Sequence, residues 1–204
     1  MQNAGFVFGC EHSACRKNKP PGINIKYFRM CKVFVSRIIL KQAVIVLNKK
    51  IRWKELIISL VIPLAVGGLS SIITKDAMKS FQALHQPLLS PPAWLFPVVW
   101  TILYLMMGLA SYQIYTSAAS EPRRRKALTV YGIQLAANFL WSILFFSLGI
   151  YLTAFIWILV LWLLIFVCAV MFYYIRNSSG KLMIPYLIWV TFAAYLNLGI
   201  YLLN

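Results

Sequence analysis

Five long apolar runs constrain the fold of this chain more than any other feature of its sequence. They cover residues 56–74, 92–115, 127–148, 151–175 and 182–203. Each run is close to the length of about 20 residues with which an α-helix crosses the hydrocarbon core of a bilayer. Of the 204 residues, 61% are hydrophobic and 12% are charged, whereas about a quarter of a soluble domain is charged. The sequence therefore predicts an all-α integral membrane protein, a bundle of five transmembrane helices.

Short links separate the later runs and carry basic residues. The links at 121–126, 149–150 and 176–181 are short enough to make consecutive helices antiparallel neighbours. If the chain crosses five times, the basic residues before residue 56, at 123–126 and at 176–181 all lie on one side. The positive-inside rule places that side, with the N-terminus, in the cytoplasm. We therefore expect a multi-pass protein of a bacterial cell membrane with cytoplasmic basic loops.

The first 48 residues form a basic extension ahead of a transmembrane domain at 49–204. The most apolar part of this extension, residues 33–47, contains Arg37 and Lys41 and is too short to span a bilayer. It is open to three readings: a disordered or surface-lying tail, a transit peptide, for which serine is sparse, or an upstream extension that is not native. We adopt the last as a hypothesis, which mass spectrometry of the natural N-terminus tests.

Neither nucleic acid nor a bound metal is predicted from the charged and metal-ligating residues. The net charge is +16, but 12 of the 20 Lys and Arg residues precede Glu55 and the rest flank the apolar runs. Such residues set orientation and contact anionic lipid. Cys10, His12 and Cys15 lie close together, but a structural zinc site takes about four ligands.

The stretch from Ser90 to Tyr104 marks the entry of the second run into the membrane. Ser90 is expected to cap the new helix, whose first turn accepts the prolines that follow. Trp94 is expected at headgroup depth, where tryptophan settles. Trp100 lies about 9 Å further along a helix and shares a face with Tyr104 and Gly108. This places Trp100 inside the bundle, as the wall of a pocket.

The loop before this stretch, residues 75–91, is unusually apolar. It carries Phe81, Leu84, Leu88 and Leu89, more than a purely solvated loop would have. We expect it to fold back over the bundle as a lid.

No Asp, Glu, Lys, Arg or His lies within the five runs, and Glu55 stands at the boundary of the first. Ion-coupled carriers place such groups near the bilayer midplane, so coupled transport is not expected. The chain also lacks a phosphate-binding loop, a zinc-protease motif and a Ser/His/Asp set, so nothing suggests hydrolysis.

Neutral polar and aromatic residues instead line the runs. Gln134 and Asn138 are spaced i, i+4 and share one face of a helix, as do Trp189, Ala193 and Asn197 in the fifth run. Such residues hold helices together, or they line a pocket for a flat, apolar ligand with a few polar atoms. The two roles are compatible.

Three motifs follow one another between residue 50 and the end of the chain. They are Pro87-x3-Pro91-Pro92-x-Trp94-x-Phe96 with Trp100-Thr101-x-Leu103-Tyr104, then Gln134-Leu135-x2-Asn138-x2-Trp141-Ser142, then Pro185-Tyr186-x2-Trp189-x3-Ala193. Together they resemble the TspO/MBR family of tryptophan-rich sensory proteins and translocator proteins, the peripheral benzodiazepine receptors.

This resemblance implies a five-helix bundle, often a homodimer, with a ligand cavity under the first loop. It implies binding of porphyrins, haem-like tetrapyrroles and benzodiazepine-type ligands. We expect no required cofactor and assign no catalytic residue. Asn138 would supply the polar contact, and the tryptophan rings would stack on the ligand or meet its edge. The ligand-binding residues it implies are Phe81, Trp94, Trp100, Tyr104, Asn138, Trp141, Trp189 and Ala193.

The leading functional hypothesis is a membrane receptor or sensor for tetrapyrroles, linked to tetrapyrrole regulation or stress response. The alternatives are a downhill transporter of tetrapyrroles or other apolar metabolites and a porphyrin-degrading enzyme. Family members commonly have tryptophan where this chain has Ser80 and Leu89. These departures weaken the case for tryptophan-dependent porphyrin breakdown.

Overall fold

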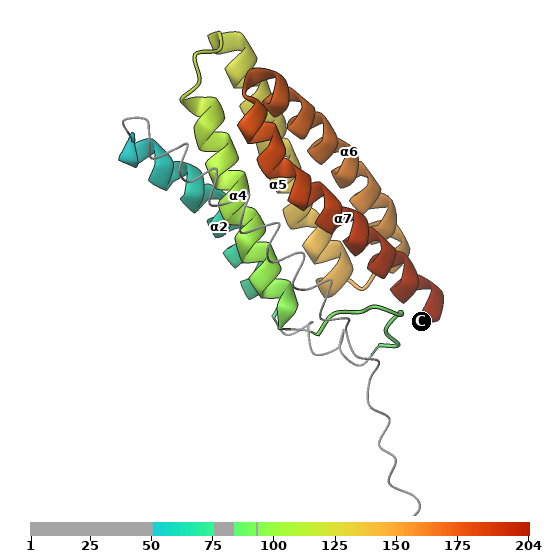
Figure 1. Cartoon of the computed structure of the whole chain (residues 1–204). Coiled ribbons are helices and arrows are strands. Elements are labelled where there is room, and N and C mark those ends of the chain that lie inside the picture. Colours follow the sequence, from blue (N-terminus) through green and yellow to red (C-terminus); the bar gives the residue numbers. More distant parts are fainter. Residues whose placement is uncertain (1–50, 76–83, 93) are drawn as a thin grey trace, which may run out of the picture.

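The computed structural model describes residues 51–75, 84–92 and 94–204. Five helices in this part of the chain are long and apolar enough to cross a membrane, which confirms the predicted fold (Figure 1). They are α2 (Trp53–Thr74), α4 (Leu95–Tyr115), α5 (Glu121–Ser142), α6 (Tyr151–Ile175) and α7 (Asn177–Leu203). A short π-helical turn, η1 (Ile143–Ser147), extends α5.

The five helices close into a ring. Contacts join α2 to α4, α4 to α7, α7 to α6, α6 to α5, and α5 back to α2. Each helix therefore presents one face to a shared interior and its remaining surface to the surroundings. The exposed surface is strongly apolar, as expected for helices solvated by lipid.

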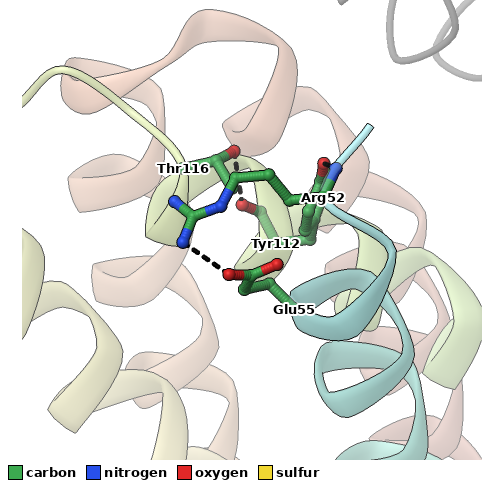
Figure 2. A network of polar contacts seen from close by, with 4 residues as sticks. All are labelled: Arg52, Glu55, Tyr112 and Thr116. Atoms are coloured by element: carbon green, nitrogen blue, oxygen red, sulfur yellow. Dashed lines mark hydrogen bonds and ion pairs between the residues drawn. The ribbon is translucent and has the colours of Figure 1, made fainter. Parts of the chain in front are cut away.

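The start of α2 is tied to the end of α4 (Figure 2). The backbone N–H of Arg52 donates to the Tyr112 hydroxyl at 3.1 Å, and the Arg52 guanidinium pairs with Glu55. The Thr116 hydroxyl donates to the Tyr112 carbonyl at 2.9 Å, which closes the last turn of α4. The bond from Arg52 to Tyr112 joins the two helices, which lie as antiparallel neighbours.

Two predicted links are helical instead. Residues 121–126 form the first turns of α5, with proline at its start, and 177–181 form the first turn of α7. The polar residues at the start of α7 find partners within the bundle: Gln113 of α4 accepts from the hydroxyls of Ser178 (2.6 Å) and Ser179 (3.1 Å). Only Arg176 interrupts the helical path between α6 and α7.

The predicted cap at Ser90 is wrong. α4 begins at Leu95, Trp94 is its N-cap residue, and the Leu95 N–H donates to the Pro92 carbonyl at 2.9 Å. Ser90 belongs to a separate turn, in which its N–H donates to Pro87 at 3.2 Å. Its hydroxyl has no hydrogen-bond partner among the residues described.

Candidate ligand-binding site in the bundle interior

Trp100 stands at the centre of an aromatic cluster inside the ring of helices. Its ring centroid lies 5.7 Å from Tyr104, 6.0 Å from Trp141 of α5 and 6.2 Å from Tyr186 of α7. Trp141 stacks in turn on Phe145 at 5.5 Å. Three helices thus contribute rings to one apolar wall.

Trp189 joins this wall from α7 through a second aromatic contact. Its ring meets that of Phe96, one turn before Trp100, edge to face at 6.0 Å. Ala193, one turn further along α7, is buried in the same apolar core. The small side chain leaves room beside the indole.

The side-chain amides of Asn138 and Gln134 in α5 form hydrogen bonds with two buried tyrosine hydroxyls. Asn138 Nδ2 donates to the Tyr104 hydroxyl at 3.2 Å, and the Tyr186 hydroxyl donates to Gln134 Oε1 at 3.1 Å. Both amide side chains are fully buried. These bonds hold α4, α5 and α7 together, the role that amides commonly have between membrane helices.

Asn197 of α7 secures the Trp141 indole. In the amide orientation that satisfies both groups, Asn197 accepts from Trp141 Nε1 at 3.2 Å and donates to the Tyr151 carbonyl at 2.9 Å. The ring of Trp141 is thereby fixed at the boundary between α5, α6 and α7.

Two buried polar atoms of the site have no hydrogen-bond partner within the described part of the chain. They are Asn138 Oδ1 and Trp189 Nε1, one acceptor and one donor. A buried polar atom without a partner costs about 1–3 kcal/mol. A ligand that carries both a donor and an acceptor would recover this free energy.

Helix α2 closes the site on the side of Tyr104. A side chain at Gly67 would overlap the Tyr104 ring, because its Cβ would lie 2.1 Å from Cε2. Gly108 also packs against α2, and its Cβ would lie 2.8 Å from the Ser59 carbonyl oxygen. Gly108, which the spacing grouped with Trp100 and Tyr104, thus permits the close approach of α2 and α4.

The described part of the loop covers the end of α7 nearest the site. Pro87 packs on Gly199, where a Cβ would lie 2.6 Å from the proline Cβ. The Tyr195 hydroxyl donates to the Leu88 carbonyl at 2.9 Å. Residues 84–92 thus dock on the bundle at the end where Trp100 lies, in the second turn of α4.

The predicted site residues have three outcomes. Trp94 lies apart from the cluster, with 61% of its surface exposed at the start of α4. Phe81 lies outside the described residues, as does the basic extension. Six residues come together in the interior: Trp100, Tyr104, Asn138, Trp141, Trp189 and Ala193.

Sequence reasoning did not include Tyr186 among the pocket residues, and it left open whether Asn197 holds helices together or lines the pocket. Tyr186 is fully buried against Trp100, and Asn197 orients Trp141. A signal was present, since both residues lie three to eight positions from Trp189 on one helix. Their partners on α4 and α5 were not visible from that spacing.

Comparison with known proteins shows the family to which the chain belongs. The sequence model of the TspO/MBR family matches residues 59–203. The tryptophan-rich protein TspO of Chlorobaculum tepidum is 35% identical over 158 residues, which cover 78% of this chain and 99% of the relative. The protein of the same name from Archaeoglobus fulgidus is 35% identical over 151 residues, 74% of this chain and 97% of the relative.

A tryptophan-rich sensory protein of Cereibacter sphaeroides is 39% identical over 126 residues, which cover 61% of this chain and 76% of the relative. The family match covers four helices in full and α2 from residue 59, and it includes every interior residue of the candidate site. The chain is therefore an integral, multi-pass membrane protein that belongs to the TspO/MBR family.

Proposed function

We propose that the protein is a membrane receptor or sensor that binds porphyrins and related tetrapyrroles, and benzodiazepine-type ligands, inside the helix bundle. The observation that carries this proposal is the pair of unpartnered polar atoms, Asn138 Oδ1 and Trp189 Nε1, in an otherwise aromatic interior. A flat ligand with a few polar atoms matches such a surface. Names of relatives, such as the tryptophan-rich sensory protein, support a sensing role.

Each side chain has a distinct part in this proposal. Asn138 Oδ1 accepts a hydrogen bond from a pyrrole or amide N–H, and Trp189 Nε1 donates to a carboxylate or carbonyl oxygen. The rings of Trp100 and Trp141 stack on the macrocycle. These rings contact one another at 6.0 Å, so the ligand binds by replacing ring–ring contacts with ring–ligand contacts.

Titration with protoporphyrin IX, followed by tryptophan fluorescence, tests the proposal. We expect saturable quenching, and we expect Trp100→Ala and Asn138→Leu each to weaken the affinity about tenfold, since each removes a contact worth about 1–3 kcal/mol.

Trp162→Phe is the matched control for this titration, because Trp162 donates to Thr191 and stacks on Phe166 away from the cluster. It should bind as the unmodified protein does. Quenching that does not saturate, or an equal affinity for Trp100→Ala, would show that the interior is not the binding site.

Downhill transport of tetrapyrroles is the second candidate function. Relatives named translocator protein, such as that of sheep, Ovis aries, favour it. The described spanning helices hold no ionisable Asp, Glu, Lys, Arg or His beyond the first three residues of α2 and the first turns of α5 and α7, so coupling to an ion gradient is not supported. Net flux of porphyrin into proteoliposomes would distinguish a carrier from a receptor, which binds without flux.

We also propose that the protein forms a homodimer in the membrane. In α2, only Pro63, Ser70 and Thr74 are buried, so most of its apolar surface is available for a second copy or for lipid. Chemical cross-linking of the protein in lipid nanodiscs should trap a dimer. A monomer at all cross-linker concentrations would contradict this.

A further inference from the structure

A hollow of about 290 Å³ lies at the opposite end of the bundle from the aromatic cluster. It opens between the last residue of α4 and the first turns of α5. Its α5 residues are spaced i, i+3, i+4, i+7 and i+8, and thus form one face of that helix. The lining residues are Tyr115, Glu121, Arg124, Arg125, Leu128 and Thr129.

The hollow is cationic on one side and aromatic on the other. The Arg124 guanidinium lies 5.6 Å from the centre of the Tyr115 ring, and that of Arg52 lies 5.9 Å from the same ring. Cation–π contacts of this kind hold guanidinium groups in place. The tyrosine ring therefore fixes two positive groups beside the hollow before any ligand arrives.

The acids nearby leave positive charge uncompensated. Glu121 pairs with Arg124, and Glu55 pairs with Arg52. Arg125 is exposed and forms no ion pair with the residues that the structure describes. The hollow thus offers one unpaired guanidinium, next to a second whose carboxylate partner lines the same space.

One part of the hollow is lined by charged residues and the other by less polar ones. Arg124 and Arg125 belong to the basic start of α5, whereas Leu128 and Thr129 lie where its apolar span begins. A phospholipid has the same sequence of properties, with a charged phosphate above and hydrocarbon below. Guanidinium groups recognise phosphate oxygens through paired N–H donors.

We propose that this hollow binds the phosphate of an anionic phospholipid with a hydroxylated headgroup. Arg125 and Arg124 contact the phosphate, Glu121 accepts a hydrogen bond from a headgroup hydroxyl, and the acyl chain passes over Leu128. Glu121 disfavours a dianionic phosphate, so a monoanionic diester is the preferred form. The site is separate from the tetrapyrrole site of the proposed function and does not depend on it.

Native mass spectrometry of the purified full chain in detergent, with added phosphatidylglycerol, tests the proposal. We expect one retained phosphatidylglycerol at concentrations where phosphatidylcholine is lost. Arg125→Gln keeps a polar side chain but removes its charge. It should weaken retention about fivefold, the effect of one basic residue near a membrane surface.

Arg123→Gln is the matched control, because Arg123 has the same charge on the same helix turn but does not line the hollow. It should retain phosphatidylglycerol within about twofold of the unmodified protein. Equal loss in both variants would overturn the proposal in favour of diffuse attraction by the basic end. Equal retention of phosphatidylcholine would overturn it as well.

Competition with inorganic phosphate distinguishes a bound lipid from a bound soluble anion. Added inorganic phosphate should leave the retained phosphatidylglycerol in place, because it lacks the acyl chain that contacts Leu128. Displacement of the lipid by inorganic phosphate at millimolar concentration would reassign the hollow to a soluble anion. Gel filtration of Arg125→Gln checks that its fold is intact, and Arg124→Gln provides a second variant with the same expected loss.

Discussion

Gly108 shows how one missing side chain sets the distance between two helices. Its Cβ would lie 2.8 Å from the Ser59 carbonyl oxygen and 2.9 Å from Leu60 Cα, both backbone atoms of α2. Backbone atoms cannot move aside as the end of a side chain can. We expect Gly108→Leu to separate α2 from α4 and to lower the free energy of unfolding by about 1–3 kcal/mol, as overpacking does. Thermal unfolding in detergent measures this.

Gly132 of α5 is the matched control for this prediction, since no atom lies within 4 Å of the Cβ that it would carry. Gly132→Leu should melt within about 0.5 kcal/mol of the unmodified protein, as surface substitutions do. If Gly108→Leu were as stable as Gly132→Leu, the close packing of α2 on α4 would be contradicted.

Single residues of the site were predictable only in part. Spacing along one helix identified Trp100, Tyr104 and Asn138 as interior residues. The same spacing grouped Gly108 with Trp100, but eight residues correspond to about 80° around a helix, enough to turn Gly108 toward α2. The unpartnered oxygen of Asn138 depends on the position of α4 and α7, which no local pattern encodes.

The side-chain amide of Asn204, directly after α7, holds the loop segment 84–92 through two hydrogen bonds to the backbone of His85. The Asn204 side chain accepts from the His85 N–H at 3.0 Å and donates to the His85 carbonyl at 3.2 Å. The Tyr195 hydroxyl adds a bond to Leu88 at 2.9 Å. Asn204→Ala should therefore accelerate amide hydrogen exchange at His85 about two- to tenfold, the effect of one lost hydrogen bond.

Leu202→Ala provides the control for this measurement, because Leu202 is 70% exposed on the same last turn. It should leave the exchange rate at His85 unchanged. Equal acceleration in Leu202→Ala and Asn204→Ala would indicate fraying of α7 instead of a specific contact with the loop.

Helices were predictable as elements, whereas their ends were not. Hydropathy determines which segments lie in lipid, so all five runs became helices. The start of α7 could not be predicted from local sequence, because Ser178 and Ser179 bond to Gln113, which is 65 and 66 positions away. Ser90 shows the opposite error: its residue type predicts a helix cap, but it lies in a separate turn before α4.

Positive charge in the described part of the molecule is concentrated at one end. Among the described residues, the end formed by Arg52, the α4–α5 connection and Arg176 holds most of the Lys and Arg side chains. The other end, formed by the loop at 84–92, the turn at Gly149 and Asn204, has few charges. Sequence predicted this asymmetry correctly, because a count of five spans is enough to assign each loop to a side.

This asymmetry predicts the orientation in the membrane. Basic loops are retained on the cytoplasmic side, so Ala118 should face the cytoplasm and Ile150 the opposite side. Both positions are exposed, one in each connection. Single cysteines placed there, in a background with Cys10, Cys15, Cys31 and Cys168 replaced by serine or alanine, report the side by labelling with a membrane-impermeant maleimide.

In intact cells, Ile150→Cys should be labelled at once, and Ala118→Cys only after the membrane is permeabilised. Labelling of both after permeabilisation shows that each thiol is reachable, so a negative result in intact cells reports the side and not burial. The reverse pattern would place the aromatic site near the cytoplasm and the phosphate-binding hollow outside. Tetrapyrrole would then enter from the cytoplasm, and the hollow would meet the lipids of the opposite leaflet.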